Sequence, residues 1–140
     1  MSEVTLRPAR DEDCERVWRW NFDPEVRARS KSRGTVSLGD HERWYRDRMT
    51  AGAFWIIELC SQPVGVVRID LDGRISIVVD AEVRGHGVAR RAIGEACAVW
   101  GRAVIAEILS DNLPSRACFE ASGFRFRHET GGLTTYDWSP

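Results

Sequence analysis

The stretch RISIVVDAEVRGHGVA, residues 74–89, joins an apolar strand to a helix through a short loop with two glycines. Apolar residues alternate between positions 75 and 79, as in a half-buried strand, and recur at helical spacing from 88 to 100. The first amides of such a helix lack intrahelical partners and lie at the positive end of the helix dipole. Because Gly85 and Gly87 carry no side chain, the loop predicts a helix start that can bind an anion.

Two other nucleotide-binding loops begin in a similar way, and their required residues are missing here. A Walker loop needs Gly-Lys-Ser/Thr, which the stretch lacks. A Rossmann fingerprint needs a third small residue three positions after Gly87, but Arg90 stands there. The remaining pattern is Arg84-x-x-Gly87-x-Ala89, although an ordinary connection into a buried helix can have the same glycines.

Composition limits the class of protein. A chain of 140 residues with 43% hydrophobic content predicts a single domain, residues 1–140. A net charge of −1 and a pI near 6.3 argue against a nucleic-acid or anionic-membrane partner. No signal peptide or membrane-spanning run is evident, so we expect a cytoplasmic protein. The four cysteines have no CxxC spacing and predict reduced core thiols rather than a metal site: Cys14, Cys60, Cys97 and Cys118.

Periodicity and turn residues predict the remaining elements. Strands are expected at 4–7, 53–60, 63–71, 74–80, 103–109, 124–129 and 133–138, and helices at 13–20, 38–50, 87–100 and 114–122. No period is evident between 25 and 39, which predicts a loop. The turns at 61–62 and 72–73 predict three successive antiparallel strands. A strand, a helix and a strand in series then predict a right-handed crossover with its two strands parallel.

A second motif follows the last of these crossover strands. Asn112-x-x-Ser115-x-x-x-Phe119-x-x-x-Gly123-Phe124 closely resembles the second signature of the GNAT superfamily of acetyl-CoA-dependent N-acetyltransferases, and the glycine loop resembles its first. The element order of the whole chain is also similar to that family's order. The resemblance implies an α/β fold, an α+β mixed sheet of GNAT type, in which a central, mostly antiparallel and splayed sheet is flanked by helices.

The resemblance also implies a site for acetyl-CoA as cosubstrate, without a metal. The implied residues are the pantetheine-pairing Ile77, Val78 and Val79, the diphosphate loop Arg84, Gly85, His86, Gly87, Val88 and Ala89, and Asn112, Ser115, Arg116 and Phe119 of the second motif. A backbone N–H near Val78 or Val79 would stabilise charge on the thioester carbonyl oxygen. Asn112 can also be a polar turn residue that caps a helix, which does not exclude the coenzyme contact.

Glu107 interrupts an otherwise apolar strand five residues before Asn112, where a related group of N-terminal alanine acetyltransferases carries its catalytic glutamate. We therefore expect Glu107 to accept the proton of the attacking amine, directly or through water. The alternative is a surface glutamate paired with an arginine. Many relatives carry tyrosine at the position of Phe119 to protonate the leaving thiolate, which phenylalanine cannot do.

The first half of the chain more loosely resembles amino-sugar-nucleotide acetyltransferases of the pseudaminic-acid pathway. This implies a small-molecule amine, a nucleotide-linked amino sugar, bound by Arg27, Ser30, His41, Trp44, Tyr45 and Arg68. Core packing or solvation explains the same side chains equally well. Acetylation of a protein N-terminus and a non-catalytic acyl-CoA sensor remain the alternatives. Small relatives often form dimers, so a homodimer is an option.

Overall fold

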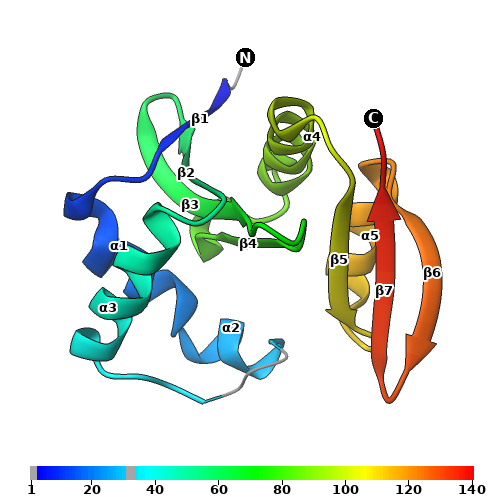
Figure 1. Cartoon of the computed structure of the whole chain (residues 1–140), viewed down its shortest axis with the longest axis horizontal. Coiled ribbons are helices and arrows are strands. Elements are labelled where there is room, and N and C mark those ends of the chain that lie inside the picture. Colours follow the sequence, from blue (N-terminus) through cyan, green and yellow to red (C-terminus); the bar gives the residue numbers. More distant parts are fainter. Residues whose placement is uncertain (1–2, 31–33) are drawn as a thin grey trace.

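The computed structural model describes residues 3–30 and 34–140, and the strands within them form two antiparallel sheets (Figure 1). One sheet has the order β1-β2-β3-β4 and the other the order β5-β7-β6. The strands are β1 Val4–Pro8, β2 Ala53–Leu59, β3 Gln62–Ile69, β4 Ile75–Val79, β5 Val104–Leu109, β6 Arg125–Thr130 and β7 Leu133–Trp138. The helices are α1 Cys14–Asn21, α2 Pro24–Ala28, α3 Leu38–Met49, α4 Val88–Trp100 and α5 Leu113–Ala121, with short 3-10 turns at Asp11–Asp13 (η1) and Ala81–Val83 (η2). The expected mixed α/β fold class is confirmed.

β4 and β5 are the strands at which the two sheets meet. In the described part of the chain, one parallel bridge between Arg74 and Ile105 is the only strand pairing between them. The Ile105 amide donates to the Gly73 carbonyl there at 2.8 Å. Past this point each strand stays with its own sheet, so the sheets diverge (Figure 1). The crossover strands are therefore parallel, as expected, but they separate almost at once.

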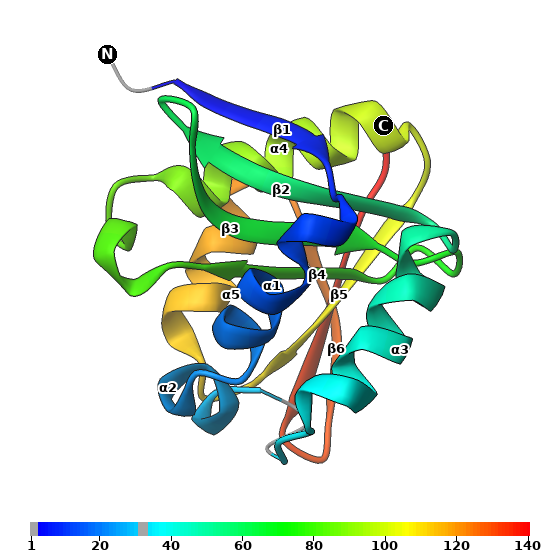
Figure 2. The ribbon, with the colours of Figure 1, turned by 90° about the vertical axis from the view of Figure 1, so that its left-hand side faces the viewer.

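Helices cover both faces of the first sheet (Figure 2). α4 lies on the face toward the second sheet and buries Ala92, Ile93 and Ala96 against the strands. On the opposite face, Val17 of α1 and Tyr45 of α3 pack with apolar residues of β2 and β3. Because both faces are covered, β3 carries an almost continuous buried run instead of a simple alternation.

β3 and β4 approach closely at Gly65, which pairs with Val79. A Cβ atom on Gly65 would lie 2.5 Å from the Val78 carbonyl oxygen. Glycine is therefore required where β4 must stay with β3 rather than follow β5.

Two local expectations differ from the structure. Residues 24–28 form α2, because Pro24 fits the first helical turn and the Asp23 side chain caps it by accepting from the Glu25 amide at 2.8 Å. Five helical residues are too few to show a period, and residues 31–33 of the expected loop lie outside the described residues. The β2–β3 turn is at Cys60 and Ser61, which both have positive φ, rather than at 61–62.

Cys97 is buried as expected of a core thiol, whereas Cys60 is exposed on its turn, so the expectation was wrong there.

Among the described residues, no helix combines the length and apolar character needed to span a membrane. In that same part of the chain, no group of His, Cys, Asp or Glu side chains is arranged to hold a metal ion.

The buried carboxylate of Asp13 fixes the start of α1 to β1. Asp13 accepts two hydrogen bonds from Arg7, at 2.8 and 2.9 Å, one from Arg16 at 2.7 Å and one from the Arg10 amide at 2.9 Å. Burial alone would raise the pKa of Asp13, but the hydrogen bonds and the charges of Arg7 and Arg16 outweigh it. The pKa therefore lies below its ordinary value.

Asp13→Asn should lower the free energy of unfolding by about 3 kcal/mol, because it removes the buried negative charge that Arg7 and Arg16 share and places an NH2 donor among their donors; Arg7 keeps its second partner, Glu58. Asp40→Asn, at an exposed pair with Arg43, should change it by less than about 0.5 kcal/mol. The Asp13 contribution is complete above the unfolded pKa near 3.8 and is lost as pH falls through the lower folded pKa. Urea unfolding between pH 2.5 and 6 should therefore show a weaker acid dependence for Asp13→Asn, and parallel curves would contradict this assignment.

Candidate active site

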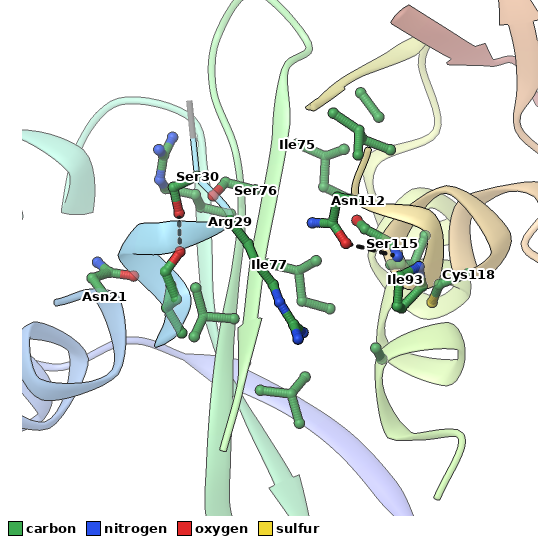
Figure 3. Close-up of a pocket in the computed structure, with 18 of the residues that line it drawn as sticks. Asn21, Arg29, Ser30, Ile75, Ser76, Ile77, Ile93, Asn112, Ser115 and Cys118 are labelled. Atoms are coloured by element: carbon green, nitrogen blue, oxygen red, sulfur yellow. Dashed lines mark hydrogen bonds between the residues drawn. The ribbon is translucent and has the colours of Figure 1, made fainter. Parts of the chain in front are cut away.

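A cavity of about 890 Å³ lies where the two sheets diverge, and we call it the cleft (Figure 3). Its walls come from the end of α1, α2, α3, β3, β4, α4, β5, α5 and the loop that precedes α4. Most of the residues expected from the sequence line it: Arg27, Ser30, His41, Trp44, Arg68, Ile77, Val78, Val79, Arg84, Gly85, Gly87, Val88, Ala89, Glu107, Asn112, Ser115 and Phe119. Tyr45, His86 and Arg116 are not among its lining residues.

The glycine loop forms one end of the cleft. Gly85 and Gly87 have φ of 83° and 76°, and Gly87 is the N-cap of α4, where no side chain of the described residues caps the helix. A Cβ atom on either glycine would meet nothing within 4 Å. The first amides of α4 therefore face open space, which fits an anion such as the diphosphate of a coenzyme.

Two contacts hold this loop against the N-terminal helices. Trp20 donates from Nε1 to Asp80 Oδ2 at 3.3 Å, and Asp80 also caps η2. Arg84 donates from Nη1 to Glu25 Oε2 at 3.2 Å. The loop is thus joined to α1 and α2.

The hydrogen bonds at the two ends of β4 show which of its residues face the cleft. Asp80 N donates to the Val64 carbonyl at 2.7 Å, and Asp70 N donates to the Arg74 carbonyl at 2.9 Å. Along an antiparallel pair, one residue directs its backbone N–H and C=O groups to the partner strand, and the next residue directs them away from it. The even-numbered residues of β4 therefore bond β3, and the odd-numbered ones direct their N–H and C=O groups toward β5 and the cleft.

Ile77 and Val79 consequently present backbone groups to the cleft, while the Val78 amide is turned to β3. The Val79 carbonyl accepts from Arg84 Nε at 3.2 Å. Of the two amides considered for stabilising negative charge on a carbonyl oxygen, the geometry favours Val79 over Val78.

The second motif lies across the cleft from β4. Asn112 caps α5, because its Oδ1 accepts from the Ser115 amide at 3.3 Å, and it also lines the cleft (Figure 3). Capping α5 and lining the cleft are therefore compatible, and the coenzyme contact of Asn112 stays a prediction. Phe119 is 4% exposed and packs edge-on against Phe124. Arg116 turns away and donates to the Tyr136 hydroxyl and the Ser110 carbonyl, both at 3.0 Å.

Glu107 projects from β5 into the cleft and is ion-paired with Arg74, with 3.0 Å between Arg74 Nε and Glu107 Oε1. Hydrogen bonds from Arg74 to Asp72 first, and to Glu107 next, raise the pKa of Arg74. The pairing that was the alternative to a catalytic role is present, yet it leaves the carboxylate on the wall of the cleft.

The other end of the cleft carries the residues expected to bind the acceptor. His41 is buried, and its Nε2 lies 2.9 Å from the Cys14 carbonyl, so Nε2 carries the proton. Burial lowers the pKa of His41, which favours the neutral ring. Arg68 binds Asp70 at 2.6 and 2.7 Å and lies over the ring of Trp44.

Tyr45 is the one expected acceptor residue that does not line the cleft. It is 1% exposed, and its hydroxyl donates to the Arg10 carbonyl at 2.7 Å. Burial raises the pKa of Tyr45. Arg29, Arg74 and Ser76 also line the cleft, and of these Arg74 and Ser76 were not selected as binding residues from the sequence. The strand alternation around Ser76 was a usable signal, because it places that side chain on the face opposite Ile75 and Ile77.

This combination of diverging sheets, an open helix start and a cleft-facing strand backbone defines an acyl-CoA-dependent acyltransferase. Residues 3–125 match the family model described as acetyltransferase (GNAT) domain, so the chain belongs to that family. It is an acetyl-CoA-dependent N-acetyltransferase. No curated protein matches the sequence.

Solved structures share the fold at low sequence identity. A domain from Methanocaldococcus jannaschii superposes with a TM-score of 0.86 at 20% identity and covers 100% of both chains. A spermidine N-acetyltransferase from Vibrio cholerae, in complex with CoA and spermine, gives 0.81 at 16% identity over 96% of this chain and 92% of its own. An aminoglycoside acetyltransferase in complex with coenzyme A and kanamycin gives 0.78 at 16% identity over 98% and 95%. These likenesses establish the fold.

Gly87→Ala should raise the Kd for acetyl-CoA roughly tenfold or more, because a Cβ would stand between a phosphate and the first amides of α4. Gly101→Ala is the matched control, since Gly101 ends the same helix with φ of 66° and equally open surroundings. Both changes should cost about 1 kcal/mol of backbone strain. Calorimetric titration measures the difference, and equal Kd values for the two variants would place the coenzyme elsewhere.

Proposed function

We propose that this protein transfers the acetyl group of acetyl-CoA to the primary amine of a small molecule, with a nucleotide-linked amino sugar as the acceptor to test first. The observation that carries this proposal is the cleft-facing backbone of β4, which runs from the glycine loop toward Glu107. One strand thus offers hydrogen bonds along the path between a diphosphate site and a carboxylate.

The thioester supplies an activated acetyl group, and the residues of the chain supply positioning and charge. Ile77 and Val79 hold the pantetheine by backbone hydrogen bonds, and the Val79 N–H stabilises charge that develops on the carbonyl oxygen. Glu107 takes the proton of the amine, directly or through water. Asn112 and Ser115 line the opposite wall.

Protonation of the leaving thiolate is not assigned to Phe119, which has no hydroxyl group. A thiol with an ordinary pKa of roughly 8.5 yields a thiolate that can leave without a side-chain acid near neutral pH. The proposed reaction therefore depends on one proton acceptor and on backbone donors rather than on a full acid and base pair.

The acceptor assignment is supported by arginines that line the cleft away from the glycine loop. Arg27, Arg29 and Arg68 are among its lining residues, and guanidinium groups suit phosphate oxygens. Trp44 offers an aromatic surface beside them, although Arg68 already lies over its ring. An acceptor that combines an amine with phosphate matches this lining.

A panel assay tests the function, with free CoA as readout. Nucleotide-linked amino sugars, free amino sugars and N-terminal peptides are each incubated with the protein and acetyl-CoA. We expect CoA release only with small-molecule amines, and most with the nucleotide-linked ones. Release with peptides alone would assign N-terminal acetylation instead, and no release with any amine would leave an acyl-CoA-binding role.

Glu107→Gln should lower kcat near neutral pH roughly a hundredfold while the Kd for acetyl-CoA is retained, because the amide cannot accept the proton. Glu58→Gln is the matched control: Glu58 also projects from a strand and binds an arginine Nε, at 2.9 Å, but lies outside the cleft. An unchanged kcat in Glu107→Gln would remove this residue from the mechanism.

A further inference from the structure

Resting on the proposed function, we infer that Arg29 binds an anionic group of the acceptor. The preferred acceptors are then primary amines that also carry a carboxylate or a phosphate, whatever the remainder of the molecule. Arg29 is the C-cap residue of α2.

The side chain of Arg29 points from α2 into the cleft, toward Ile77 of β4 (Figure 3). It remains 55% exposed. Its ionic contact among the described residues is Glu25, at 3.8 Å, which exceeds hydrogen-bond distance. The guanidinium can therefore give most of its donors to a ligand.

Three other arginines of the cleft hold carboxylates at hydrogen-bond distance. Arg68 binds both oxygens of Asp70, Arg74 binds Glu107 at 3.0 Å, and Arg84 binds Glu25 at 3.2 Å. Because Glu25 is held closely by Arg84, it keeps a cationic partner when Arg29 turns to an anion. The exchange therefore leaves no carboxylate unpaired.

The position along the cleft indicates which anion Arg29 meets. The diphosphate is proposed to lie at Gly85 and Gly87, on the first amides of α4. Arg29 instead points to Ile77, in the middle of β4, where the proposed pantetheine is uncharged (Figure 3). An anion at this place therefore belongs to the acceptor rather than to the coenzyme.

α2 is held well enough to present Arg29 in one place. Glu25 ties the helix to Arg84 of the glycine loop, and Trp20 ties the preceding helix to Asp80 of the same loop at 3.3 Å. A planar guanidinium on a fixed helix end recognises carboxylate or phosphate oxygens through two parallel hydrogen bonds. Because its position is fixed, Arg29 can distinguish an anionic acceptor from a neutral one.

The test compares acceptor pairs that differ only in the anion: an amino acid and its amide, and a phosphorylated amino sugar and the free sugar. The unaltered protein should acetylate the anionic member of at least one pair with the lower KM. Arg29→Gln should raise that KM about tenfold or more and leave the KM of the neutral member unchanged. A change with the amino-acid pair would identify a carboxylate as the anion that Arg29 binds, and a change with the sugar pair would identify a phosphate.

Arg19→Gln is the matched control, because Arg19 also pairs with a glutamate four residues earlier near a helix end, but lies outside the cleft. It should alter none of these values. An equal loss with both members, or a raised Kd for acetyl-CoA in Arg29→Gln, would overturn the inference while the proposed function stands. Failure of every amine with the unaltered protein would contradict the proposed function and this inference with it.

Discussion

The missing ladder between β4 and β5 is the feature on which the site depends. In a continuous sheet, the outward N–H and C=O groups of Ile77 and Val79 would pair with the neighbouring strand. Here the pairing stops after the bridge at Arg74, so those groups face the cleft, where the Val79 carbonyl accepts from Arg84 instead. Each forgone hydrogen bond costs about 1 kcal/mol net, which water or a ligand in the cleft can return. The fold thus leaves backbone hydrogen-bonding groups of β4 available where an extended ligand can bind to them.

Packing on both sides explains why the two sheets do not close. α4 buries Ala92, Ile93 and Ala96 beside the divergence, and Phe119 of α5 packs into the same core. Closing β5 onto β4 along its whole length would expel these side chains and open a cavity elsewhere. On the other edge, Gly65 lets β3 approach the Val78 carbonyl closely, so β4 is held on that side alone.

The donor half of the site could be predicted from the sequence because its signals are local. The glycines before α4, the cap at Asn112 and the strand alternation each depend on a few neighbouring residues, and the structure brings them to one cleft. The acceptor half depends on how helices rotate against the sheet, which no short pattern records. Trp44 and Tyr45 are adjacent on α3 and about 100° apart around its axis, so one faces the cleft and the other enters the core.

The proposed proton transfer to Glu107 also requires that the positive charge of Arg74 keeps a negative partner. Glu107 becomes neutral when it takes a proton, and a guanidinium left alone beside it would oppose that step. Arg74 has a second carboxylate partner in Asp72, to which it donates from both its backbone amide and its side chain. Arg74 therefore keeps a counter-ion in both protonation states of Glu107. An arginine shared between two carboxylates makes the ion pair compatible with a general base, because only one of the two acids faces the reacting amine.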